Sequence, residues 1–166
     1  MLAGIWAQSQ NGLIGQDDGF KGMPWELPND LKHFQNVTTG GTVVMGRKSF
    51  EAMGGKALKN RENIVLTTRE NYEKDDIKVF HNTEDVLKYA ESVNHPVYII
   101  GGASVFAQFM DNIDRIYRTV IHETFDGDTY MTDIDWDNFK LVESIEGTVD
   151  EKNKYPHTFE IYDRIS

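Results

Sequence analysis

Short apolar runs alternate with helical periods over the first two thirds of the chain, and this alternation leaves few folds open to it. Runs rich in β-branched and aromatic residues are predicted to form strands at residues 2–8, 42–45, 63–66, 78–80 and 97–100. Between them, apolar residues recur every three or four positions at 29–37, 83–92 and 103–113, which predicts helices. Alternating strands and helices favour a largely parallel sheet.

The pattern changes after Ile113. Strand-like segments at 115–122, 139–146 and 158–162 follow one another without a strong helical period between them. We therefore expect an α/β fold whose sheet finishes with antiparallel strands.

Length, charge and cysteine content exclude several classes of protein. A chain of 166 residues suits a single domain over 1–166, and a formal net charge of −10 disfavours binding to nucleic acid or to an anionic membrane surface. The absence of cysteine excludes disulfides, thiolate metal sites and a cysteine nucleophile. The first residues lack the charged region of a signal peptide, and no apolar run reaches membrane-spanning length, so we expect a cytoplasmic protein.

A carboxylate stands on the apolar side of the first predicted helix. At about 100° per residue, Asp30 shares a face with Leu31, Phe34 and Val37. Burial on that face would raise the pKa of Asp30, and such a group can supply or tune protons. The alternative, which this helix alone favours, is that Asn29 or Asp30 simply caps the helix.

Two predicted strand-to-helix junctions, 45–49 and 100–104, are rich in small residues. Backbone N–H groups at helix starts attract phosphate, and glycine allows close approach, so the two junctions together suit a pyrophosphate. Thr67 and Arg69 follow another predicted strand, and Arg47 adds a second positive charge. The alternative is that the glycines serve only the turns and that the arginines are ordinary exposed side chains.

Patterns of other functional classes do not fit. Segment 41–49 has one residue too many between glycine and lysine for a nucleotide P-loop. A calcium loop beginning at Asp133 would have Asn138 in place of its turn glycine and Ser144 in place of its closing glutamate. The 5 histidines show no metal-binding spacing, so no metal is expected.

Seven motifs occur in order along nearly the whole chain: Ile-Trp-Ala at 5–7, Asn-Gly-Leu-Ile-Gly at 11–15, Pro-Trp at 24–25, Leu-Pro-Asn-Asp-Leu at 27–31, Met-Gly-Arg at 45–47, Ile-Gly-Gly at 100–102 and Phe-Asp-Gly-Asp-Thr at 125–129. Together they resemble bacterial dihydrofolate reductases. The resemblance implies a three-layer αβα fold around a twisted, mostly parallel sheet of about eight strands with an antiparallel C-terminal pair. It also implies NADPH-dependent reduction of 7,8-dihydrofolate, with hydride transfer to pterin C6 and water-mediated protonation of N5.

The resemblance assigns catalytic roles to Asp30, Trp25 and Thr119. Asp30 would bind pterin N3 and the 2-amino group, Trp25 would hold an ordered water, and Thr119 would bridge to Asp30 or to the 2-amino group. The implied substrate-binding residues are Ile5, Ala7, Leu31, Phe34, Met53, Leu58, Arg61 and Ile100. Among them, Arg61 would clamp the glutamate α-carboxylate of the substrate, a task that suits a planar bidentate donor.

For NADPH, the resemblance places nicotinamide near Ala7, Ile14 and Gly15, and the 2′-phosphate near Arg47, Thr67 and Arg69. The full implied set is Ala7, Ile14, Gly15, Gly46, Arg47, Lys48, Ser49, Leu66, Thr67, Arg69, His81, Gly101, Gly102, Ala103, Ser104, Val105 and Phe106. A cis peptide between Gly101 and Gly102 and a small adenosine-binding subdomain around 42–92 are also implied. The resemblance further implies a monomer that binds dihydrofolate and antifolate inhibitors.

Two other functions remain open at this level. One is a related reductase that acts on another pterin or on a pyrimidine, and the other is a noncatalytic NADPH-binding protein. Arg61 and Phe34 favour a substrate that carries glutamate, whereas Trp25, Asp30 and Thr119 together disfavour a silent binder. A purely structural role is the weakest alternative.

Overall fold

A computed structural model describes residues 1–15 and 25–166. Residues 16–24 lie outside the described part, and with them the proline of the 24–25 motif. In the described part of the chain, no helix is long and apolar enough to cross a membrane.

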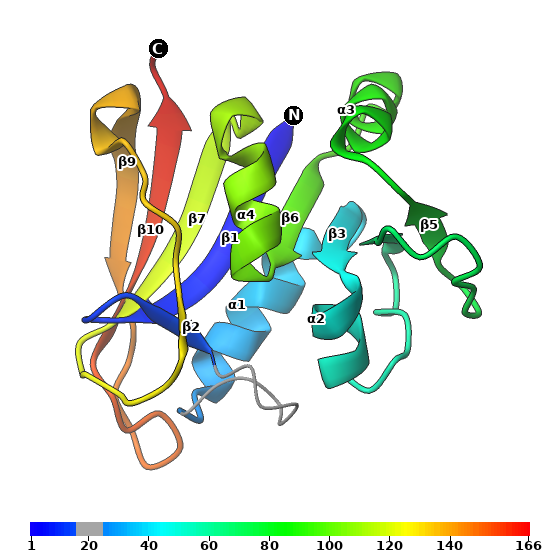
Figure 1. Ribbon diagram of the computed structural model, residues 1–166. Coiled ribbons are helices and arrows are strands. Elements are labelled where there is room, and N and C mark those ends of the chain that lie inside the picture. Colours follow the sequence, from blue (N-terminus) through cyan, green and yellow to red (C-terminus); the bar gives the residue numbers. More distant parts are fainter. Residues whose placement is uncertain (16–24) are drawn as a thin grey trace.

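A central sheet of eight strands organises the fold (Figure 1). Its order is β5-β4-β3-β6-β1-β7-β10-β9, and the strands from β5 to β7 run parallel while β10 is antiparallel to β7 and β9. The strand bounds are β1 Leu2–Ser9, β3 Thr42–Gly46, β4 Glu62–Leu66, β5 Lys78–Phe80, β6 Val97–Gly101, β7 Arg115–Ile121, β9 Phe139–Glu146 and β10 His157–Arg164. Two short strands, β2 Leu13–Gly15 and β8 Thr129–Tyr130, form a separate pair.

Helices cover both faces of the sheet. On one face lie α1 (Pro28–Thr38) and α2 (Arg47–Ala52), and on the other lie α3 (Thr83–Ser92) and α4 (Ala103–Phe109). Short 3-10 turns follow at Met110–Asn112 and Trp136–Asn138. The predicted three-layer α/β fold with an antiparallel end is therefore confirmed, although the helix predicted over 103–113 changes to a 3-10 turn after Phe109.

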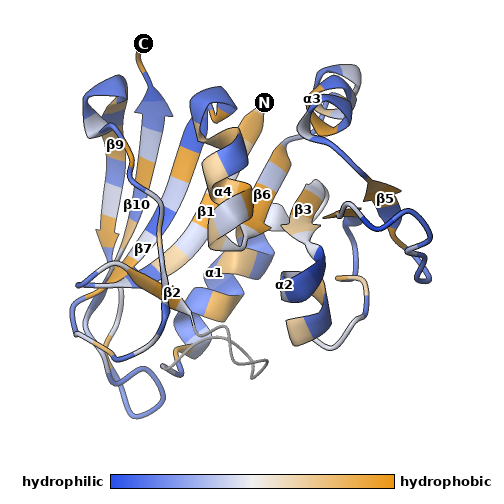
Figure 2. Cartoon of the chain, in the orientation of Figure 1, coloured by the Kyte–Doolittle hydropathy of each residue, from blue (hydrophilic) through white to orange (hydrophobic). Residues whose placement is uncertain are grey.

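The side-chain alternation of β1 separates two apolar cores. Ile5 faces α1 and α2 and packs with Phe50 and Met45, whereas Trp6 faces α4 and packs with Phe106. Figure 2 shows the apolar residues, in orange, along the central strands. The two faces of the sheet therefore offer different environments to a ligand.

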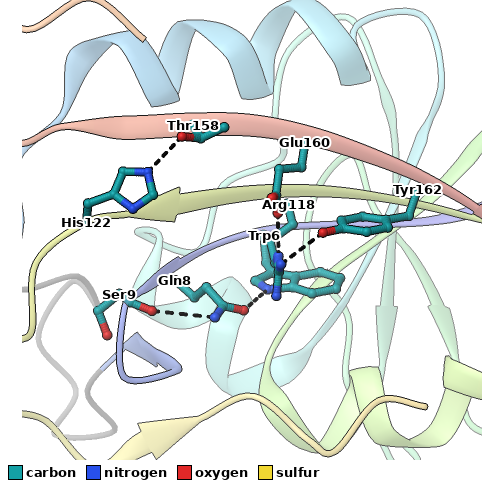
Figure 3. A network of polar contacts seen from close by, with 8 residues as sticks. All are labelled: Trp6, Gln8, Ser9, Arg118, His122, Thr158, Glu160 and Tyr162. Atoms are coloured by element: carbon teal, nitrogen blue, oxygen red, sulfur yellow. Dashed lines mark hydrogen bonds and ion pairs between the residues drawn. The ribbon is translucent and has the colours of Figure 1, made fainter. Parts of the chain in front are cut away.

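A polar network occupies the α4 face of β7 and β10 (Figure 3). The Arg118 guanidinium bonds the Glu160 carboxylate at 2.8 Å and the Tyr162 hydroxyl at 3.1 Å, and it lies 4.4 Å from the Trp136 ring centroid. On the same face of β1, the Trp6 indole donates to Gln8 at 3.0 Å. Arg118 therefore has hydrogen-bond partners within the sheet and holds the Trp136 ring against this face.

Candidate active site

Asp30 is the third residue of α1, which begins at Pro28, a favoured first helical residue. The capping position is held by Leu27, which makes no side-chain cap, so the alternative in which Asn29 or Asp30 caps the helix is wrong. The Asp30 carboxylate instead accepts a hydrogen bond from the Thr119 hydroxyl on β7. Thr119 is buried and pairs with Ala7 on β1, so the carboxylate lies over the centre of the sheet.

Burial raises the pKa of Asp30, and this effect is larger than the lowering by the Thr119 hydrogen bond and by the charges of His33 and His157. The direction agrees with the sequence prediction. The side chain as a whole is only half-buried, which leaves part of it open to a ligand. A carboxylate held in this way can exchange hydrogen bonds with a polar ring while remaining poorly solvated.

Two histidines that the sequence pattern did not indicate lie near Asp30, and Phe159 packs against both of them. The centroid of the Phe159 ring lies 4.4 Å from that of the His33 ring and 5.2 Å from that of the His157 ring. Burial lowers the pKa of His33, while the charge of Asp30 raises it. His33 could have been found from its i,i+3 spacing to Asp30, but His157 and Phe159 reach the site only through the pairing of β10 with β7.

Trp25 is buried beside this carboxylate helix. It packs with Ala7 and Leu27, and its ring lies 5.3 Å from that of Phe125. The Phe125 ring is in turn 5.1 Å from that of Tyr155. Trp25, Phe125 and Tyr155 therefore form a row of three packed aromatic rings.

An apolar strip continues from Asp30 along α1. Ile5, Phe34, Leu58 and Ile100 belong to one cluster on this face of the sheet. Leu31 and Met53 do not, because their side chains are 61% and 44% exposed. The prediction that Leu31 lies on the buried side of the helix is therefore wrong; it and Met53 are exposed apolar side chains next to the strip.

Arg61 lies at the other end of α1. Its Nη1 donates to the Thr38 hydroxyl at 3.0 Å, its Nε donates to the Lys59 carbonyl at 2.9 Å, and its guanidinium carbon is 5.9 Å from the Phe34 ring centroid. Eight residues of helix, or about 12 Å of rise, separate Asp30 from Thr38. The face of α1 thus has a carboxylate at one end, an aromatic ring in the middle and a cation at the other end.

The two glycine-rich junctions meet in space. A side-chain carbon built on Gly46 would lie 3.1 Å from Val105 of α4, and one built on Gly102 would lie 3.4 Å from the Ser49 hydroxyl of α2. The starts of α2 and α4 therefore face each other at the carboxyl edge of the neighbouring strands β3 and β6. The predicted cis peptide between Gly101 and Gly102 is present.

A second group of cofactor candidates gathers beside β4 and β5. The His81 Nδ1 lies 2.8 Å from the Thr67 carbonyl, and the Arg69 N–H donates to the Thr67 hydroxyl at 3.2 Å. Arg47 is paired with Glu51 at 2.8 Å.

Tyr72, which the sequence did not indicate, connects the two arginines. Its hydroxyl donates to Glu51 at 3.0 Å. Burial and this hydrogen bond raise the pKa of Tyr72, whereas the charges of Arg47 and Arg69 lower it. Both guanidinium groups therefore lie near the same hydroxyl, with the Glu51 carboxylate as the anion paired with Arg47.

The remaining predicted cofactor residues are distributed around these groups. Lys48 and Ser104 are exposed, Ala103 is half-buried, and Leu66, Gly101 and Phe106 are buried. Ile14 packs against the Trp6 cluster, while Ala7 belongs to the Trp25 cluster, so these two residues are on different sides of β1. Within residues 1–15 and 25–166, no group of three acidic or histidine side chains could hold a metal ion.

Comparisons with known proteins agree on one family. A family model described as dihydrofolate reductase matches residues 1–164. The dihydrofolate reductase of Enterococcus faecium is 40% identical over 167 residues, which covers 100% of this chain and 98% of that protein. That of Bacillus subtilis (strain 168) is 40% identical over 164 residues, 99% of this chain and 95% of that protein. A solved structure, the dihydrofolate reductase from Enterococcus faecalis complexed with NADP(H) and RAB-propyl, superposes with a TM-score of 0.95 at 44% identity and covers 100% of this chain and 97% of that chain.

Proposed function

The chain belongs to the dihydrofolate reductase family, and from this premise we propose that it uses NADPH to reduce 7,8-dihydrofolate to 5,6,7,8-tetrahydrofolate. Hydride passes from the nicotinamide to C6 of the pterin, a proton from water reaches N5, and NADP⁺ leaves. The product supports one-carbon metabolism and the synthesis of thymidylate and purines. The observation that carries the proposal is the placement of the Asp30 carboxylate, which Thr119 holds at one end of a helix whose other end meets Arg61.

Asp30 binds the pterin and polarises it. Two carboxylate oxygens in one plane match two donors, the N3 hydrogen and the 2-amino group of the ring. The Thr119 hydroxyl donates a hydrogen bond to the carboxylate, and Trp25 holds the water that supplies the N5 proton. Because Asp30 contacts N3 and the 2-amino group rather than N5, it tunes the ring instead of protonating N5 itself.

The rest of the substrate follows α1. The p-aminobenzoyl ring lies along Phe34 and Leu58, which belong to the apolar strip, with the exposed Leu31 and Met53 closing over it. Arg61 binds the glutamate α-carboxylate at the far end. The exposed apolar side chains support this assignment, since a bound ring would remove them from water.

NADPH occupies the other half of the site. The pyrophosphate lies between the facing starts of α2 and α4, and the 2′-phosphate lies between Arg47 and Arg69, close to Thr67. The segment around 42–92, which includes Arg47, Thr67 and Arg69, serves as the adenosine-binding subdomain. The enzyme works in the cytoplasm as a monomer and binds antifolate inhibitors in place of dihydrofolate.

The direct test is a turnover assay. Purified protein is mixed with NADPH and dihydrofolate, and nicotinamide oxidation is followed, with NADH and an unconjugated dihydropterin in parallel reactions. We expect turnover that requires dihydrofolate, prefers NADPH and falls strongly without the glutamate tail. No folate-dependent oxidation would overturn the proposal, and equal rates with the unconjugated dihydropterin would favour a reductase for another pterin.

A further inference from the structure

One backbone N–H in the first turn of α1, that of Asn29, has no acceptor among its neighbours in the sequence. Pro28 has no N–H, and the N–H groups of Asp30 and Leu31 both reach the Leu27 carbonyl, at 3.0 and 3.3 Å. The N–H of Asn29 remains. It donates to the side-chain oxygen of Asn153, 124 residues further along the chain, at 2.8 Å. A distant asparagine thus takes the place of the missing cap.

Asn153 belongs to the loop between β9 and β10, residues 147–156, which lies near the start of α1 (Figure 1). The side chain is only 4% exposed. One oxygen of Asp150 accepts hydrogen bonds from the Asn153 side-chain nitrogen at 3.0 Å and from the Asn153 and Lys152 N–H groups at 2.8 and 2.9 Å. Because a carboxylate only accepts, the Asn153 nitrogen faces Asp150 and its oxygen faces α1.

The same loop makes a second hydrogen bond with Asn29. The Asn29 side-chain nitrogen donates to the Thr148 carbonyl at 3.1 Å. At the base of the loop, the Gly147 N–H donates to the His157 carbonyl at 2.8 Å, and the fully buried His157 ring packs against Gly147. Asn29, the residue directly before Asp30, is therefore held between two points of a closed loop.

The loop also reaches Trp25. Tyr155 belongs to this loop and to the row of aromatic rings. Its ring centroid lies 5.1 Å from that of Phe125, and the Phe125 centroid lies 5.3 Å from that of Trp25. No comparable contact from this loop reaches the facing starts of α2 and α4 among the described residues. The loop therefore supports the pterin half of the site and not the cofactor half.

We propose that Asn153 is a positioning residue for dihydrofolate reduction: it caps α1 from across the fold and so fixes the turn that carries Asp30. This inference rests on the proposed function. Asn153 acts through Asn29 and does not itself touch the substrate. Without the cap, the Asn29 N–H loses its acceptor, the first turn frays, and the Asp30 carboxylate no longer meets both donors of the pterin.

The test compares Asn153→Ala with Asn82→Ala. Asn82 caps α3 by accepting from the Asp85 N–H at 2.9 Å, so its loss removes an equivalent cap from a helix remote from Asp30. Active sites are counted by NADPH binding, and the dihydrofolate KM, the rate per active site and the NADPH dissociation constant are measured for each variant. Asp150→Ala is the second variant, since it releases Asn153 by changing only an exposed side chain.

We expect Asn153→Ala to raise the dihydrofolate KM and lower the rate per active site, with about a fivefold loss from a cap of ordinary strength, while NADPH binding stays within about twofold of wild type. Asp150→Ala should change the same two quantities in the same direction, and Asn82→Ala should change neither. A dihydrofolate KM and per-site rate in Asn153→Ala equal to those of Asn82→Ala would overturn the inference. If Asn153→Ala does not fold, unchanged constants in Asp150→Ala would overturn it.

These outcomes are separate from the test of function. A wild-type protein without folate-dependent turnover would overturn the proposed function. Turnover by the wild type, with Asn153→Ala matching the Asn82→Ala control, would leave that function standing and remove only the role of Asn153.

Discussion

The residues around Asp30 set the pKa of its carboxyl group. Burial raises its pKa, while the Thr119 hydroxyl and the charges of His33 and His157 act in the opposite direction. The helical spacing of Asp30 was visible in the sequence, and it correctly indicated a poorly solvated carboxylate. His157 and Asn153 were not visible, because β10 and its preceding loop approach α1 only after the sheet has formed.

Replacing Asp30 by asparagine should separate reduction from cofactor binding. The amide keeps the shape of the side chain but cannot accept two hydrogen bonds as a carboxylate does, so we expect kcat/KM for dihydrofolate at pH 7 to fall by about 100-fold or more. The loss should diminish at low pH, where the substrate is already protonated. A pH profile of kcat/KM and an NADPH titration check this, and an equal loss of NADPH affinity would instead indicate a folding role for Asp30.

The same substitution should stabilise the fold at neutral pH. Because burial raises the pKa of Asp30, the native state holds its proton more tightly than the unfolded chain, so stability declines as pH rises from the ordinary value of 3.8 towards the raised native value. Asp30→Asn removes this decline. Its melting temperature should exceed that of the wild type at pH 7, and the difference should shrink towards pH 4; a constant difference across this range would argue against a raised pKa.

Elements of ordinary length were predictable and very short ones were not. The central strands and α3 follow clear periodicities, and α1 extends the predicted range by one residue at each end. The strands β2 and β8 have 3 and 2 residues, too few for a period to show, and they exist because they pair with each other. The 147–156 loop likewise carries no recognisable pattern, since its shape depends on Asp150, Asn29 and the buried ring of His157.

This loop should be intolerant of a methyl group at its base. A side-chain carbon on Gly147 would overlap the His157 Nε2. Because the His157 ring is fully buried, it cannot move aside into solvent. We expect Gly147→Ala to lower the free energy of unfolding by about 2 kcal/mol, as overpacking of a buried group commonly does. Thr148→Ala, at an exposed neighbour that contributes only its carbonyl to Asn29, is the control; equal denaturant midpoints for the two variants would contradict the prediction.

At the scale of the whole molecule, one sheet joins the two halves of the site. The turn of Asp30 lies over β1 and β7, while the facing starts of α2 and α4 stand at the ends of the adjacent strands β3 and β6. The alternation of strands and helices predicts this edge as a ligand site. It does not predict which side chains complete the site, because loops from the C-terminal third of the chain return to α1.

Binding of the cofactor should therefore raise the free energy of unfolding of the whole molecule. NADPH at about 100 times its dissociation constant is expected to raise the free energy of unfolding by about 2.7 kcal/mol, and NADH at the same concentration should raise it less because it lacks the 2′-phosphate. Thermal unfolding followed by calorimetry checks both statements. Equal stabilisation by the two dinucleotides would contradict the placement of the 2′-phosphate at Arg47 and Arg69.

The position of Asp30 relative to a bound pterin is decisive for substrate and mechanism together. A crystal structure with NADP⁺ and folate should place the two Asp30 carboxylate oxygens within hydrogen-bonding distance, about 2.7–3.2 Å, of pterin N3 and the 2-amino nitrogen, with the Thr119 hydroxyl still on the carboxylate. A pterin bound elsewhere, or an Asp30 carboxylate turned away from the ring, would contradict the proposed function.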